Sequence, residues 1–279
     1  MIVLEACAGL GNRMYSIASA YHLAQITNQK LLILWNIDNS CKAKADAIFD
    51  FPVDMEIIYT TNYSLKHSPL RHLKSKFIKR HYKLAASTVL YSNSISILRN
   101  YHNGFAYLCE AASQQELLYI ESCYFFLPPD KRKKEYFALF KPSDQVWHKA
   151  APIINKLPKN AIGLHIRRTD HEEAITHGPL QAFIDKIDQH LQNTPSATFF
   201  LATDDKETER QLVLTYPNNI IVNPAKQFTR KSTDGIIDAY IDILCLSRCA
   251  RIIGSYESTF SQIAAILGNV PLEIVDTLA

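Results

Sequence analysis

The sequence predicts an α/β protein built on parallel β-sheets, and two observations carry this prediction. Short, continuous hydrophobic runs recur through the second half of the chain, and helical patterns separate them. Continuous rather than alternating hydrophobic strands are typical of parallel sheets that helices cover on both faces. The chain also opens with a strand, a glycine turn, a helical pattern and a second strand, which together make a βαβ unit.

The opening unit can be read element by element. MIVLEAC (residues 1–7) predicts a strand, GLGN a turn, and residues 13–27 a helix that ends at Asn28 as its C-terminal cap. KLLILW (residues 30–35) predicts the second strand. Residues 40–110 give no clear order of elements. We expect a strand at residues 119–126 and a helix at residues 131–140.

The second half is regular. We expect strands at residues 161–167, 197–203, 219–223, 251–255 and 271–275, and helices at 179–192, 205–216, 233–249 and 258–268. The sequence LPKN (residues 157–160) is the expected boundary between an N-terminal domain, 1–157, and a C-terminal domain, 158–279.

Composition narrows the class of function. Of the 279 residues, 47% are hydrophobic and 20% charged, and the net charge of +3 is too small to indicate nucleic-acid binding. The six scattered cysteines predict buried thiols rather than disulfides; they are Cys7, Cys41, Cys109, Cys123, Cys245 and Cys249. The N-terminus does not resemble a signal peptide, and no run approaches the ~18 apolar residues of a membrane span. We therefore expect a cytoplasmic protein.

Ligands of such sheets bind beyond the carboxyl ends of the strands. This rule selects four candidate segments, which are Gly9 to Arg13, Arg167 to Asp170, Thr203 to Asp205 and Ser255 to Gln262.

The second of these segments is the most specific. In LHIRRTD a buried strand ends in Arg167 and Arg168, and guanidinium groups hold phosphate through paired, charge-assisted hydrogen bonds. A bound anion is one interpretation, and an ion pair with Asp170 is the other.

The acids Asp204 and Asp205 have two interpretations as well. They could bind a metal, or Thr203, Asp204 or Asp205 could cap the following helix, and an acid that does not cap would be free for a ligand hydroxyl.

The last segment places hydroxyl residues before a helix, where free backbone amides bind phosphate. Ser261 and Gln262 could add donors, although capping by Ser258 or Thr259 explains part of the pattern. In the preceding helix, Asp242 has hydrophobic neighbours, so it lies either at a buried edge that could accept hydrogen bonds from guanine or on a solvated face.

Two further stretches allow competing interpretations. GLGNR resembles a dinucleotide fingerprint, with Asp38 as the ribose-binding acid, but Met14 stands where the third glycine belongs. The stretch from Lys66 to Lys83 is strongly basic and contains no acid. It could contact acidic lipids at the membrane, a lipid-linked acceptor or a nucleic acid, or it could be a solvated helix.

Taken together, HIRRTD, FFLATDD and DAYIDILCLSRCARIIGSYESTFSQ resemble the fucosyltransferase superfamily in order and spacing. The resemblance is greatest to the α1,6-fucosyltransferases and the rhizobial nodulation fucosyltransferases, which are related to the bacterial α1,2-fucosyltransferases. GLGNRMYSIASAYHLAQITNQKLLIL resembles the N-terminal motif of the same superfamily. The resemblance implies a GT-B-type architecture of two Rossmann-like domains and an inverting transfer from GDP-fucose without a metal or other cofactor.

The resemblance also implies a role for each candidate residue. Arg167 would bind the β-phosphate with help from Ser261 and Gln262, and His165 and Asp242 would contact guanine. Arg168, Asp204 and Asp205 would organise the pocket. The segment that contains Gly9, Gly11, Asn12 and Arg13 would approach the diphosphate from the N-terminal domain. The general base falls at Glu172 or Glu173, and Glu173 is favoured.

The resemblance implies a carbohydrate acceptor, which we expect to be a surface polysaccharide or a lipid-linked oligosaccharide. The competing functions are an NAD-type oxidoreductase, based on GLGN and Asp38, and a non-catalytic nucleotide- or carbohydrate-binding protein on the same fold.

Overall fold

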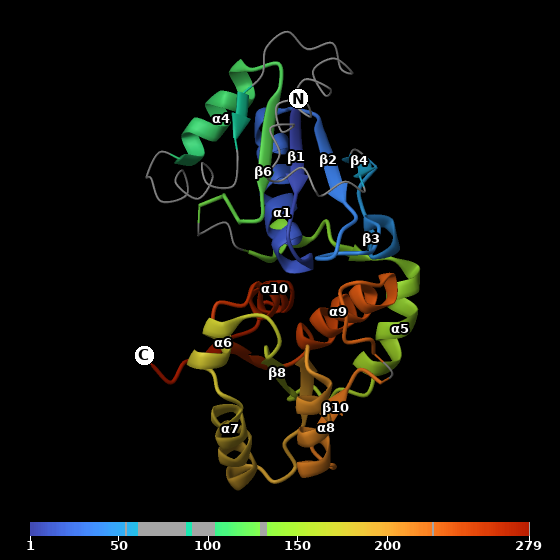
Figure 1. Cartoon of the computed structure of the whole chain (residues 1–279), viewed down its shortest axis with the longest axis vertical. Coiled ribbons are helices and arrows are strands. Elements are labelled where there is room, and N and C mark those ends of the chain that lie inside the picture. The colour runs from blue at the N-terminus through green and yellow to red at the C-terminus, as the bar shows by residue number, and fades with distance from the viewer. Residues whose placement is uncertain (54, 61–87, 91–103, 129–132, 225, 279) are drawn as a thin grey trace. The chain divides into compact units, whose positions relative to one another are not determined.

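The computed structural model describes residues 1–53, 55–60, 88–90, 104–128, 133–224 and 226–278 (Figure 1). The basic stretch from Lys66 to Lys83 lies outside them. The chain divides into two compact units, of which unit 1 comprises Met1–Lys141 with Arg230–Thr233, and unit 2 comprises Pro142–Thr229 with Asp234–Ala279. None of the described helices has the length and apolar character needed to cross a membrane.

Unit 1 contains a five-stranded parallel sheet in the order β4-β2-β1-β6-β5. Its strands are β1 (Ile2–Ala6), β2 (Leu31–Asn36), β4 (Met55–Thr60), β5 (Thr88–Leu90) and β6 (Leu118–Ser122). Its helices are α1 (Leu10–Thr27) and α4 (Gly104–Gln114), with a short 3-10 helix, η1 (Ala45–Ala47). The βαβ opening is confirmed, including Asn28 in a left-handed C-cap conformation.

In this region one expected strand is shorter than predicted and one expected helix was wrong. The strand expected at 119–126 ends at Ser122, because the Ser122 hydroxyl accepts a hydrogen bond from the Tyr124 amide and turns the chain. In place of the helix at 131–140, the described residues form only a 3-10 helix, η4 (Lys134–Phe137). Phe137 packs with Tyr15 and Phe125, and this aromatic packing overrides the helical preference. Strands β3 (Phe49–Asp50) and β7 (Lys141–Pro142) form a separate two-stranded sheet.

Unit 2 contains the second five-stranded parallel sheet, in the order β10-β9-β8-β11-β12. All five expected strands are present, as β8 (Ile162–Ile166), β9 (Phe199–Thr203), β10 (Ile220–Val222), β11 (Arg251–Ser255) and β12 (Leu272–Val275). The four expected helices are present as α7 (Leu180–Asn193), α8 (Lys206–Thr215), α9 (Thr233–Leu246) and α10 (Thr259–Gly268). The sequence did not predict α5 (Asp144–Ile154) or α6 (Glu172–His177).

Helices cover both faces of this second sheet (Figure 1). From β8 the chain proceeds through β9 to β10, then returns past β8 to β11 and β12. Right-handed crossovers therefore place α7 and α8 on one face and α9 and α10 on the other. The direction of winding reverses between β8 and β11, and such a switch point is where ligands bind in sheets of this kind.

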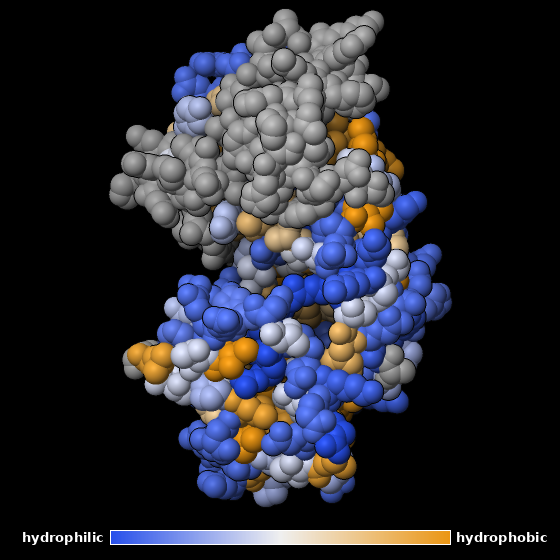
Figure 2. Space-filling model, in the orientation of Figure 1, coloured by the Kyte–Doolittle hydropathy of each residue, from blue (hydrophilic) through white to orange (hydrophobic). Residues whose placement is uncertain are grey.

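Strand β8 shows how the two faces differ. Leu164 and Ile166 pack into a hydrophobic cluster with Phe183 and Ile187 of α7. The intervening Gly163 faces the opposite side, where a β-carbon would lie only 2.8 Å from Leu246 of α9. Hydrophilic residues cover most of the coloured surface in Figure 2, as expected for elements whose hydrophobic sides pack inward.

Candidate active site

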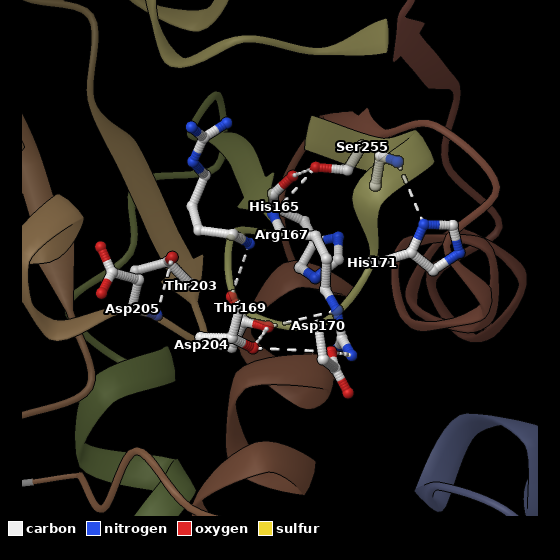
Figure 3. Close-up of polar contacts among 11 residues, drawn as sticks. His165, Arg167, Thr169, Asp170, His171, Thr203, Asp204, Asp205 and Ser255 are labelled. Atoms are coloured by element: carbon white, nitrogen blue, oxygen red, sulfur yellow. Dashed lines mark hydrogen bonds and ion pairs between the residues drawn. The ribbon is translucent and has the colours of Figure 1, made fainter. Parts of the chain in front are cut away.

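The loop after β8 carries Arg167, and its partners are acidic (Figure 3). The Arg167 amide donates to Ser255 Oγ of β11 at 2.9 Å. The guanidinium makes an ion pair with Asp170 through Nη2, and Nε lies 3.2 Å from Asp204 Oδ2. The side chain is 19% exposed. Arg167 is thus oriented by two carboxylates while part of its side chain reaches solvent.

Asp204, directly after β9, organises this loop. Its Oδ1 accepts a hydrogen bond from the Arg168 amide at 2.7 Å, and its Oδ2 accepts one from Thr169 Oγ1 at 2.6 Å. The Arg168 guanidinium donates instead to the Gly178 carbonyl at 3.4 Å, at the end of α6. The two neighbouring arginines therefore have different surroundings.

Asp205 caps α8. Its Oδ2 accepts hydrogen bonds from the Thr208 amide at 2.8 Å and the Thr208 hydroxyl at 2.6 Å. The Thr208 hydroxyl is the main cause that lowers the pKa of Asp205. Of the two acids, one is a helix cap and the other supports the Arg167 loop.

His165 is buried on the α10 side of β8. Its ring stacks on Phe260, with 4.7 Å between the centroids. Burial lowers the pKa of His165 to about 3, and the positive charges of Arg167 and Lys226 lower it as well, so the imidazole is neutral. Its Nδ1 is buried and makes no hydrogen bond within the described part of the chain.

Asp242 of α9 is buried, so the expectation of a buried edge is confirmed and the solvated face is wrong for this residue. Lys226 Nζ lies 3.2 Å from Asp242 Oδ2 and 2.8 Å from Glu209 Oε2 of α8. Burial raises the pKa of Asp242 to about 6, although the Lys226 charge opposes this shift. Burial lowers the pKa of Lys226, but the two carboxylates outweigh that effect and raise it.

Sequence reasoning missed Lys226 and Glu209. A signal for Lys226 was present, because it lies just beyond β10, at the same edge of the sheet as the other candidates. Glu209 carried no signal, since an acid within a polar helix is ordinarily solvated.

Helix α10 begins beside β11. Its N-cap, Ser258, makes no side-chain capping hydrogen bond, so the Ser258 hydroxyl does not satisfy the first backbone amides. Ser261 is fully buried and donates to the Ser258 carbonyl at 3.3 Å, while Gln262 is partly buried. Ser261 lies against Gly254, where a β-carbon would come within 2.7 Å of it. The serine is therefore held firmly at the start of the helix.

Glu172 and Glu173 are exposed in the first turn of α6. The His171 ring caps this helix by accepting the Ala174 amide at 3.0 Å. The pKa of Tyr256, which follows β11, is raised by Glu257 first, then by burial, Asp276 and Glu173. Glu173 is thus the glutamate of this pair whose charge reaches the loop between β11 and α10.

The glycine turn of unit 1 holds a different kind of arginine. Arg13 is completely buried in α1, and its guanidinium donates to the Ala8 carbonyl at 2.8 Å and the Asn36 carbonyl at 2.6 Å. It also pairs with Asp38 at 3.2 Å and lies 4.8 Å from the Trp35 ring centroid. In this turn Gly9 precedes α1, Gly11 is buried and Asn12 is partly buried.

Asp38 is already occupied in unit 1. Besides Arg13, it accepts the backbone amides of Ser40 at 2.7 Å and Cys41 at 3.2 Å. A carboxylate bound in this way serves the fold, so the geometry gives no support to Asp38 as a ribose-binding acid.

The family model for nodulation protein Z (NodZ) matches residues 1–275. The chain belongs to the NodZ family. No curated protein matches its sequence. The turn at Gly9 to Arg13 and the edge of the unit 2 sheet both fall within the matched residues, so the family covers every candidate described above.

Solved structures resemble this NodZ family member over nearly its whole length. NodZ α1,6-fucosyltransferase co-crystallised with GDP has a TM-score of 0.62 and 18% identity, covering 97% of this chain and 93% of that one. A mutant of FUT1 from Arabidopsis thaliana in complex with GDP has a TM-score of 0.62 and 16% identity, covering 98% and 69%. The apo form of POFUT1 has a TM-score of 0.57 and 12% identity, covering 98% and 97%. The fold is therefore of the GT-B type, as expected.

Proposed function

We propose that this NodZ family member is an inverting, metal-independent glycosyltransferase that transfers fucose from GDP-fucose to a carbohydrate. The observation that carries the proposal is Arg167, whose partly exposed side chain follows β8 at the switch point, near the start of α10, where Ser258 makes no side-chain capping hydrogen bond. Crystals of a NodZ α1,6-fucosyltransferase, to which the fold is similar, were soaked with GDP-fucose.

In this proposal Arg167 and the start of α10 bind the β-phosphate. Asp170 is 55% exposed, so its ion pair with Arg167 is weak and a phosphate oxygen can replace it. Asp204, which also holds the loop backbone, would remain in place and keep the guanidinium oriented. Backbone amides of the first turn of α10 would donate to the same phosphate, supported by Ser261 and Gln262.

The reaction is a single displacement. The acceptor hydroxyl oxygen bonds to the anomeric carbon of fucose as the bond from that carbon to the β-phosphate oxygen breaks, and GDP leaves with the bonding electrons. Glu173 takes the hydroxyl proton. Arg167 and the α10 amides stabilise the negative charge that develops on the β-phosphate, and such preorganised groups usually provide the largest contribution to catalysis. A guanidinium in this role supports a metal-independent reaction.

The remaining assignments stay predictions. His165 and Asp242 are the residues we propose for guanine, and the unit 1 turn at Gly9, Gly11, Asn12 and Arg13 keeps its predicted role toward the donor. The acceptor we propose is a surface polysaccharide or oligosaccharide, which the basic stretch from Lys66 to Lys83 could contact at a membrane when it is lipid-linked.

Calorimetric titration with GDP tests the donor site. Arg167→Ala should weaken GDP binding by about tenfold to a hundredfold, because a charge-assisted hydrogen bond contributes ~1.5–3 kcal/mol. Arg168→Ala is the matched control, since its guanidinium is directed to the Gly178 carbonyl, and it should weaken binding less. Equal GDP affinity of wild type and Arg167→Ala would rule out the role assigned to Arg167.

Turnover distinguishes an enzyme from a binding protein. Release of fucose from GDP-fucose in the absence of acceptor should be slow but measurable in wild type and lost in Arg167→Ala. Glu173→Gln should lower transfer to an oligosaccharide acceptor while leaving GDP affinity unchanged, and Glu172→Gln should change neither. The assignment of the base fails if the Glu172 variant has the larger defect.

A further inference from the structure

Five buried polar side-chain atoms of unit 2 make no hydrogen bond within the described residues. Arg167 Nε and Glu209 Oε2 lie in ion pairs, and the Asn223 side chain faces Asp242, which leaves His165 Nδ1 and Asp242 Oδ1. Such an atom costs ~1–3 kcal/mol when left without a partner, so native structures contain few of them. The two atoms come from β8 and α9, yet the charge of Lys226 acts on both residues. Their grouping points to a polar ligand.

Lys226 links these atoms. It lies 3.2 Å from Asp242, and its charge acts on His165. Asn223 lies close enough to Asp242 to lower the pKa of that carboxyl. The Lys226 side chain is only 4% exposed, its Nζ lies 2.8 Å from Glu209, and it stands 4.8 Å from the centroid of the Phe228 ring. These contacts on several sides fix the position of the ammonium and the directions of its N–H donors.

The number of donors matters at this position. An ammonium has three N–H donors; Asp242 Oδ2 accepts one of them, and Glu209 Oε2 forms an ion pair with the same ammonium at 2.8 Å. Even if Glu209 takes a second donor, the third has no acceptor among the described residues. The cluster therefore offers a carboxylate oxygen that can accept, at Asp242 Oδ1, beside an ammonium hydrogen that can donate.

One edge of guanine has the complementary pattern. It presents the acceptor O6 next to the donors N1–H and N2–H, whereas adenine presents an amino donor in the position of O6. We propose that Lys226 is the residue that selects the base, by donating a hydrogen bond to O6 of guanine while Asp242 accepts from the N–H groups. Glu209 is a positioning residue that holds the ammonium. This inference rests on the proposed function, since it concerns the nucleotide of the same donor.

Nucleotide analogues isolate the contact to O6. GDP, 6-thioguanosine diphosphate and inosine diphosphate would be titrated calorimetrically into wild type and Lys226→Met. The thio analogue keeps both N–H groups but replaces O6 with a weaker acceptor, and the inosine analogue keeps O6 but lacks the N2 amino group. Titrations at about pH 7.5 lie above the pKa of Asp242, which is about 6 in wild type, and below the pH at which N1–H of the thio analogue ionises.

Wild type should bind GDP about tenfold more tightly than the thio analogue. Lys226→Met should bind the two with equal affinity, while its preference for GDP over inosine diphosphate should match that of wild type because Asp242 is intact. If Lys226→Met discriminates against the thio analogue as strongly as wild type does, the proposal is overturned and the donor function stands. If wild type binds no GDP, both proposals fail.

Two controls keep the test interpretable. Lys186→Met removes a lysine that pairs with Glu273 in the same unit, and it should leave all three affinities unchanged. If Lys226→Met does not fold, as judged by circular dichroism, the comparison of GDP with the thio analogue in wild type still tests whether the protein donates a hydrogen bond to O6. If wild type binds those two nucleotides equally, no hydrogen bond to O6 contributes to affinity and the proposal is overturned.

Discussion

Arg13 and Arg167 each follow the first strand of a five-stranded parallel sheet, yet their surroundings differ completely. Arg13 is fully buried, and two of its acceptors are backbone carbonyls. Arg167 is partly exposed, and its acceptors are the side chains of Asp170 and Asp204.

The difference shows what makes an arginine available to a ligand. A backbone carbonyl cannot move away without unfolding its segment, so the Arg13 guanidinium stabilises unit 1. A carboxylate on an exposed loop can exchange its guanidinium for solvent, so Arg167 can accept a new anion. The following predictions test this contrast, from the largest expected effect on free energy to the smallest.

Arg13→Met should destabilise the protein by about 3–5 kcal/mol, because it leaves Asp38 buried without its counter-ion and removes the hydrogen bonds to the Ala8 and Asn36 carbonyls. Urea unfolding followed by circular dichroism measures this change. Arg13→Lys should not restore stability, since an ammonium cannot reach three acceptors in fixed directions. If Arg13→Met unfolds at the same urea concentration as wild type, Arg13 does not stabilise unit 1 and the contrast with Arg167 fails.

Gly254→Ala should cost about 1–3 kcal/mol, since the new β-carbon would lie 2.7 Å from Ser261 and 3.1 Å from Leu272. The same denaturation experiment measures it, and GDP affinity should fall with it because Ser261 is displaced at the start of α10. Gly9→Ala is the matched control, as no heavy atom lies nearer than 4.0 Å to a β-carbon there. Equal stability of the two variants would contradict tight packing beneath the Arg167 loop.

Asp242 is buried, as Arg13 is, but its charge changes with pH. Its pKa is raised from 3.8 to about 6, so its contribution to stability is complete below pH 3.8 and is lost as the pH rises through about 6. GDP binding has the opposite dependence, since guanine N–H groups need the ionised form. Affinity should fall by up to about tenfold per pH unit below pH 6, about 1.4 kcal/mol per unit.

Calorimetry across that range measures the pH dependence. His165 does not contribute, because its pKa of about 3 keeps it neutral. Asp242→Asn should bind GDP weakly and without this pH dependence, and an unchanged profile in the variant would assign the titration to another group.

Arg167→Ala should have the smallest effect on stability, less than about 1 kcal/mol, because its ion pairs are partly exposed. Its effect on turnover of GDP-fucose should nonetheless be about a hundredfold to a thousandfold. Unfolding and GDP-fucose turnover should be measured on the same preparation of Arg167→Ala, so that its loss of stability can be compared directly with its loss of activity. A loss of stability as large as that of Arg13→Met would show that Arg167 also serves the fold.

The sequence predicted every strand of unit 2 because continuous hydrophobic runs between helices leave few alternatives. The same reasoning placed Arg167 and Asp204 at one edge, since parallel strands end together. A helix cap was expected at Thr203, Asp204 or Asp205 because these residues precede a helical pattern, and Asp205 is the one that caps α8.

Other features depend on contacts between distant segments, which a local pattern does not contain. GLGNR gave no sign that the Arg13 guanidinium would bond to Asn36, the last residue of β2, and to Asp38 just beyond it. Lys226 is brought to Glu209 and Asp242 only by the winding of the sheet. The short helix α6 was missed because its six residues, Glu172–His177, carry little hydrophobic periodicity.

Ser255 shows how a sheet can separate two strands without leaving backbone groups unpaired. Strands β8 and β11 pair as far as His165 and Gly254 and then diverge. At that point the Ser255 hydroxyl donates to the His165 carbonyl at 3.2 Å and accepts the Arg167 amide at 2.9 Å. One side-chain atom thus replaces the next two backbone partners of the ladder. Alanine there would leave both groups unbonded, whereas threonine would keep the hydroxyl, so the opening between the strands permits very few side chains at this position.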